Sequence, residues 1–113
     1  MSDSSFLEYL RQSVVRRYGA RADEVRVVRS PYRICPLGAH IDHQLGPVTA
    51  MAIDRAVHVA YAPLAGEVRL SSLDFAGDVA FSLAHVPDRR DGDWGNFARG
   101  AVRALQQRDP LRW

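Results

Sequence analysis

The chain contains no lysine, so all 15 of its basic side chains are arginines. Arginine pairs well with phosphate through its planar guanidinium group, and an arginine-rich chain is a candidate for nucleic-acid binding. Here, however, the arginines are scattered from Arg11 to Arg112 among acidic residues, and the formal net charge is only +2. A genome rich in G and C produces the same bias without any such partner. We therefore expect no nucleic-acid partner.

Cysteine is nearly absent, because Cys35 is the only one in the chain. A single cysteine excludes an internal disulfide and fits a reducing compartment. Long apolar runs are lacking too, and residues 1–18 are too polar and charged for a signal peptide. These absences predict a cytoplasmic protein without a membrane partner. The 113 residues leave room for one domain with a modest core.

Two periods organise the apolar residues that are present. An apolar residue at every fourth position predicts a helix over residues 4–18, which Gly19 ends. Strict alternation between residues 25 and 83, together with an apolar segment at 48–53, predicts about five short strands. The alternating positions are Val25 and Val27, then Val57, Val59 and Tyr61, then Val68 and Leu70, then Val79, Phe81 and Leu83.

Helical spacing returns near the end of the chain, where Asp93 is placed to cap a second helix. The order is therefore one helix, the strands, and one helix, which predicts an α+β domain with a largely antiparallel or mixed sheet. The apolar stripe of the second helix consists of Trp94, Phe97, Ala98, Ala101 and Leu105.

A polar loop, PYRICPLGAHIDHQLG at residues 31–46, carries most of the residues suited to chemistry. A metal site there would use His40, Asp42 and His43, with Cys35 in reserve. On an extended chain His43 faces away from the other two, and no second ligand cluster follows, so we expect no metal held by protein ligands alone. A nucleophilic role for Cys35 is disfavoured, because Pro36 follows it and no helix N-terminus adjoins it.

A sugar or polyol site suits this loop better. Carboxylates accept paired hydrogen bonds from neighbouring hydroxyls, and imidazole can donate or accept. Arginine can meet a phosphate or carboxylate with two parallel hydrogen bonds. Asp42, His40 and Arg33 supply this set within ten positions.

The loop and its surroundings resemble the galactokinase branch of the GHMP kinases, and the run PYRICPLGAHIDHQ resembles galacturonokinases more than ordinary galactokinases. The later segment WGNFARGAVRAL is similar to a helix of the same family, so the resemblance covers most of residues 25–107 in order. The residues that match the first family signature are Pro31, Arg33, Gly38, Ala39 in the place of an acid, His40, Asp42 and Gly46, followed by VTAMAI.

The resemblance implies a role for each of these residues. The counterpart of Asp42 holds ring hydroxyls of the sugar, and that of His40 lies beside the same pocket. Arg33 is the implied catalytic residue, near the anomeric hydroxyl and the transferred phosphate, where a guanidinium group stabilises developing charge. Gly38 and Gly46 allow tight turns close to the ligand. We therefore expect the sugar to be bound by Arg33, Ala39, His40, Asp42 and Gly46.

Ala39 departs from the family pattern, in which an acid binds the C6 hydroxyl of the sugar. If C6 is a carboxylate instead, an acid at this position repels it by about 4 kcal/mol at roughly 4 Å and an effective dielectric near 20. Alanine removes this repulsion and opens space. We therefore expect galacturonate as the substrate, with galactose as the second choice.

The sequence also lacks parts of the family pattern. The serine- and glycine-rich loop that holds the phosphates of ATP, and the catalytic aspartate beyond it, have no counterpart in residues 1–113. We expect an N-terminal sugar-binding portion that stops before the ATP site, with ATP and Mg²⁺ needed only by the complete enzyme. Alone it should be inactive, with apolar faces on its strands and second helix partly uncovered. The alternative is a non-catalytic sugar-binding or regulatory module.

Overall fold

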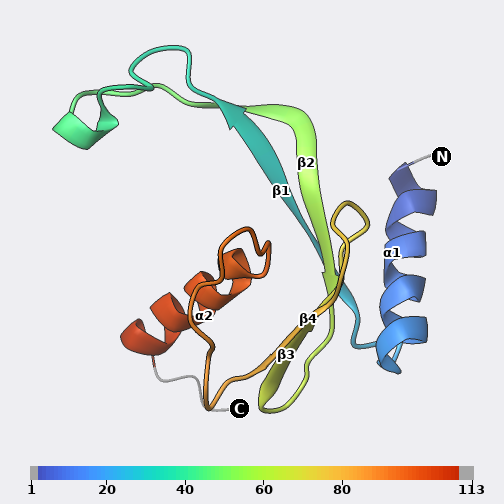
Figure 1. Ribbon diagram of the computed structural model, residues 1–113. Helices are drawn as coiled ribbons and strands as arrows, with labels where there is room; N and C mark the ends of the chain where they lie inside the picture. The colour runs from blue at the N-terminus through green and yellow to red at the C-terminus, as the bar shows by residue number, and fades with distance from the viewer. Residues whose placement is uncertain (1–2, 110–113) are drawn as a thin grey trace. The chain divides into compact units, whose positions relative to one another are not determined.

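A computed structural model describes residues 3–109. The chain divides into two compact units, Met1–Pro63 and Leu64–Trp113, each of which contains one helix and one β-hairpin (Figure 1). The predicted α+β class and the order of helix, strands and helix are confirmed. The described residues form four strands in two antiparallel pairs. Among them, no helix has the length and apolar character that crossing a membrane requires.

Helix α1 (Asp3–Tyr18) confirms the first predicted helix. It ends at Gly19, whose φ of 67° is left-handed and whose N–H donates to the carbonyl of Val15 at 2.9 Å. The helix packs on the hairpin of the same unit, where the ring of Phe6 meets the imidazole of His58 edge-on with centroids 5.5 Å apart. His58 therefore has a structural contact within the unit.

Strands β1 (Arg26–Ile34) and β2 (Met51–Tyr61) form the hairpin of the first unit. The predicted strands at 48–53 and 57–61 merge into β2, which is why four strands are observed instead of about five. The register of β1 against β2 shifts between Pro31 and Arg33, so that Pro31 faces Ala56 but Arg33 faces Ala52. Proline has no N–H for the ladder, and such irregularities concentrate beside functional sites.

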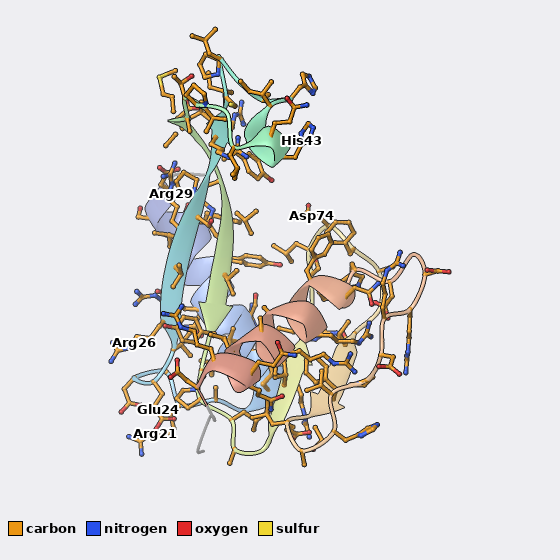
Figure 2. All side chains as sticks on the ribbon, turned by 90° about the vertical axis from the view of Figure 1, so that its left-hand side faces the viewer. Arg21, Glu24, Arg26, Arg29, His43 and Asp74 are labelled. Carbon is orange, nitrogen blue, oxygen red and sulfur yellow. The ribbon has the colours of Figure 1, made fainter. Side chains whose placement is uncertain are left out.

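The shift in register leaves Asp54 without a paired residue on β1, and its carbonyl is bound by a side chain instead. The guanidinium group of Arg29, which Figure 2 shows beside the hairpin, donates to the carbonyl oxygen of Asp54 at 2.9 Å. The polar residues Asp54 and Arg55 thus interrupt the pairing of a continuous strand without ending it. A sequence pattern that counts only apolar positions divides the strand at this point.

The two faces of the β1–β2 hairpin differ. On the face that carries His58, alternate residues of β2 are partly buried, and this face contacts α1. The opposite face stays about half exposed, in agreement with the expected uncovered apolar surface. Its large apolar residues are Val28, Val57, Val59 and Tyr61, at 49%, 46%, 47% and 48% exposure.

The second unit consists of the hairpin of β3 (Glu67–Leu70) with β4 (Val79–Ser82) and helix α2 (Asn96–Arg108). Val79 and Phe81 are its buried apolar residues. Gly95 lies so close to Val79 that a Cβ atom there would stand 2.8 Å from one of its methyl groups. Trp94 stacks on Phe75 with ring centroids 6.0 Å apart.

A polar stripe of helix α2 faces the preceding segment, residues 83–95. Asn96, Arg99, Arg103 and Gln106 follow helical spacing along one face. Asn96 binds the main chain of Arg90, and Arg99 binds the carboxylate of Asp93. Arg103 binds the carbonyl of Val86 and the carboxylate of Asp88, and Gln106 binds the carbonyl of Leu83.

The apolar face of α2 is partly uncovered, as expected, and one other expectation for this helix is corrected. Phe97 and Leu105 of the apolar stripe are 85% and 51% exposed. The helix is capped by Gly95, and the carboxylate of Asp93 accepts from the Gly95 N–H at 2.7 Å, just before the first turn. Asp93 thus fixes the approach to the helix without being its cap.

Candidate functional site

The loop of residues 35–50 joins β1 to β2 at the free end of their hairpin (Figure 1). It contains a single 3₁₀ turn, η1 (Asp42–Gln44), which is continued by Leu45 in the left-handed conformation with a φ of 61°. The carbonyl of Ile41 accepts from the N–H groups of Gln44 and Gly46, each at 3.1 Å. The turn thus folds back on itself through its own main chain.

Two glycines let the limbs of this loop approach closely. Gly38 has a φ of 89°, and a Cβ atom there would stand 2.5 Å from the carbonyl oxygen of Pro47. A Cβ atom at Gly46 would stand 2.7 Å from the Cδ1 atom of Ile41. Gly38 therefore meets rigid main chain, whereas Gly46 meets a flexible side chain.

The loop has two limbs, one before the turn η1 and one after it, and both line a single hollow of about 280 Å³. The hollow brings together three of the predicted site residues, Arg33, Ala39 and Asp42. His40 and Gly46 lie in the same loop but are not among the lining residues. The complete lining consists of Arg33, Cys35, Gly38, Ala39, Asp42, Val48, Thr49 and Ala50.

The charged side chains in and near the hollow have few partners among the described residues. Within residues 3–109, the side chains of Arg33 and His40 form no hydrogen bond or ion pair. The carboxylate of Asp42 lies 3.8 Å from Nδ1 of His43, which projects from η1 in Figure 2, and both side chains are about 70% exposed, at 70% and 68%. A guanidinium group and a carboxylate thus remain available to a ligand with hydroxyl or anionic groups.

Sequence reasoning missed four lining residues: Val48, Thr49 and Ala50 of the returning limb, and Cys35 as part of the wall. The thiol of Cys35 donates to the carbonyl of Leu37 at 3.3 Å. No spacing rule points to the returning limb, because the turn at Gly46 decides which of its residues face Arg33. Within the described range, no three histidine, cysteine, aspartate or glutamate side chains lie together as a metal site requires.

The comparisons with known proteins agree on one family. The galactokinase galactose-binding signature matches residues 15–63, which include the whole loop. The chain is similar to the galactose-binding region of galactokinase-type sugar kinases. A galacturonokinase of Arabidopsis thaliana is 40% identical over 119 residues, covering 90% of this chain and 28% of that protein. A galactokinase of Chloroflexus aggregans is 38% identical over 89 residues, covering 77% of this chain and 23% of that protein.

These family relationships rest on sequence. The chain spans about a quarter of the length of these relatives, at 28% and 23%. No solved structure matches it. The signature nevertheless covers α1 in part, both strands of the first hairpin and the hollow in the loop that joins them.

Proposed function

We propose that this chain is the N-terminal sugar-binding part of an ATP-dependent sugar 1-kinase, which phosphorylates the anomeric hydroxyl of galacturonate or galactose. One observation carries the proposal: Arg33, Ala39 and Asp42 line a single hollow within the galactokinase signature. Asp42 accepts hydrogen bonds from ring hydroxyls, and Arg33 stabilises the charge of the phosphoryl group in transfer.

The proposal ranks the five sugar-binding residues. Asp42, Arg33 and Ala39 line the hollow and are expected to matter most. His40 and Gly46 keep the roles that the resemblance implies, but they lie outside the lining, so their substitution should have a smaller effect on affinity.

Within this proposal the chain binds the sugar and does not turn it over. ATP and Mg²⁺ belong to the complete enzyme, because no serine- and glycine-rich phosphate loop occurs in residues 1–113. Purified chain should therefore show no sugar-dependent hydrolysis of ATP. Phosphorylation of any hexose by this chain alone would contradict that part of the proposal.

Calorimetric titration with galacturonate and galactose tests sugar binding. Asp42→Ala should weaken the better ligand by roughly 10- to 100-fold, because it removes hydrogen bonds to a charged group. Asp91→Ala is the matched control, since Asp91 is a 94% exposed aspartate of the other unit and should leave binding unchanged. Equal affinity of Asp42→Ala and the unchanged chain for both sugars would reject the assignment.

Ala39→Glu tests the choice between the two sugars. A carboxylate at position 39 repels a C6 carboxylate by about 4 kcal/mol at close range but accepts a hydrogen bond from a C6 hydroxyl. The ratio of the two dissociation constants should therefore move from galacturonate toward galactose. A ratio that stays constant would mean that position 39 does not face C6.

A further inference from the structure

The hollow is built from two limbs of a long loop, and something must hold those limbs at a fixed distance. The loop of residues 35–50 exceeds the roughly 12–15 residues beyond which loops without regular structure are uncommon in compact domains. Arg33 enters the hollow from the end of β1, whereas Thr49 and Ala50 enter it from the start of the returning chain. The separation of the limbs therefore sets the width of the hollow.

One pair of residues closes the loop at its base. The N–H of Thr49 donates to the carbonyl of Leu37 at 3.0 Å, and the N–H of Leu37 donates to Oγ1 of Thr49 at 3.1 Å. The Thr49 hydroxyl also lies 3.4 Å from the Leu37 carbonyl, to which it can donate. Both main-chain polar groups of Leu37 are thus satisfied by Thr49.

The side chain of Thr49 joins the two sides of the loop where the main-chain hydrogen bonds between β1 and β2 have already ended. The β1–β2 pairing ends with Ile34 opposite Met51, so Leu37 and Thr49 lie beyond the last paired residues. Only one of their contacts is a main-chain bond, and the two others depend on the hydroxyl. The hydroxyl is consequently the part of this closure that a single substitution can remove.

We infer that Thr49 is a positioning residue for the sugar site, an inference that rests on the function proposed above. Its hydroxyl is engaged by Leu37 and acts through the main chain, while the ligand is contacted by Arg33 and Asp42. Loss of the hydroxyl lets the limbs separate, which widens the hollow and weakens the binding of a sugar that must touch both sides.

Three chains separate this role from others: the unchanged protein, Thr49→Val, which has nearly the same shape but no hydroxyl, and Thr49→Ser, which restores the hydroxyl. In the free protein, amide hydrogen exchange of Leu37 should be roughly 3- to 10-fold faster in Thr49→Val, as expected for the loss of one net hydrogen bond. The amides of α1 should keep their rates. Thr49→Ser should return Leu37 to its original exchange rate.

Titration with galacturonate completes the test. Affinity should fall by a similar roughly 3- to 10-fold in Thr49→Val and recover in Thr49→Ser. Reduced affinity with unchanged Leu37 exchange would overturn the inference, because Thr49 would then contact the sugar directly. Faster exchange with unchanged affinity would overturn it as well.

If the proposed function itself is wrong, the experiments give a different result. In that case neither the unchanged chain nor Asp42→Ala binds galacturonate or galactose, whatever the exchange rate of Leu37. Binding that disappears in Asp42→Ala and persists at full strength in Thr49→Val rejects the role of Thr49 alone.

Discussion

The loop of residues 35–50 and the segment of residues 83–95 use the same kinds of side chain in opposite ways. In the second segment, Asp88 and Asp93 are bound by Arg103 and Arg99 of α2 at 2.6 and 2.7 Å. At the first loop, Asp42 and the adjoining Arg33 of β1 line a common hollow and are largely exposed. Charges that neutralise one another hold a segment in place, whereas charges left apart remain available to a ligand.

The two segments also differ in what stabilises them. Segment 83–95 is held by side chains of a neighbouring helix, which bind its carbonyls and carboxylates. Loop 35–50 is held by its own main chain, by Gly38 and by the closure at Thr49. Substitutions should therefore affect stability in the second segment and ligand binding in the first, apart from those that force the main chain of the loop apart.

The largest effect is expected from Gly38→Ala, compared with Gly92→Ala in the other segment. Both glycines have left-handed φ values, 89° and 72°, but only Gly38 has main-chain atoms within contact distance of a new Cβ. Gly38→Ala should cost about 3 kcal/mol or more, and Gly92→Ala about 1 kcal/mol from backbone strain alone. Chemical denaturation and hydrogen exchange of Thr49 measure the difference, and equal costs would contradict the close approach at Pro47.

Arg99→Met and Arg33→Met sharpen the contrast between a structural and a free arginine. Arg99 is 5% exposed and bound to Asp93 and Asn96, so its loss should destabilise the second unit by about 2 kcal/mol. Arg33→Met should change stability by less than about 0.5 kcal/mol, as at other exposed positions. Its effect should appear in sugar binding instead. Comparable losses of stability in both variants would remove the distinction.

Acidification should loosen the second segment. The hydrogen bond from Arg99, supported by the N–H of Gly95, holds the pKa of the Asp93 carboxyl below its usual range. The resulting stability is present above the ordinary carboxyl pKa of about 4 and is lost as the pH falls through the lower folded value. The indole N–H signal of Trp94, which donates to the carbonyl of Ala76, reports this change.

Asp93→Asn is the control for the acid response. Asparagine does not titrate, so the change in the Trp94 signal below about pH 4 should shrink. The exchange rates of the 35–50 loop serve as an internal reference. An unchanged acid response in Asp93→Asn would assign it to other carboxyl groups.

The smallest effect is expected at Leu45, which is 96% exposed and is the only non-glycine residue with positive φ among residues 3–109. Leu45→Gly removes strain of about 1 kcal/mol but adds freedom to the unfolded chain, so a net gain of about 0.5 kcal/mol or less is expected. Gln44→Gly, which relieves no such strain, should be destabilising. Thermal unfolding of both variants checks the sign.

The sequence was sufficient for the elements that follow a simple period. Helix α1 and the two hairpins follow from the spacing of their apolar residues. The merger of two predicted strands into β2 could not be foreseen, because it depends on Arg29 satisfying the carbonyl of Asp54. The contacts of α2 with segment 83–95 could not be foreseen for a similar reason, because a count of apolar positions does not include long polar side chains that bind main-chain carbonyls.

At the candidate site, the lining residues before the turn at Gly46 could be named in advance, and those after it could not. Arg33, Ala39 and Asp42 stand in a run that resembles a family signature. Thr49 joins them only because Gly38 and Gly46 let the chain reverse tightly. Which residues meet after such a reversal depends on main-chain geometry that no residue type specifies by itself.

The closure between Leu37 and Thr49 has a consequence for how this loop can evolve. Because the ends are joined at the base, the segment between Gly38 and Gly46 can lengthen, shorten or change chemistry without disturbing the pairing of Ile34 with Met51. The entropy of closing a loop grows only with the logarithm of its length, about 0.6 kcal/mol for each doubling. The chemistry of this segment can therefore vary while the pairing of the hairpin beneath it stays the same.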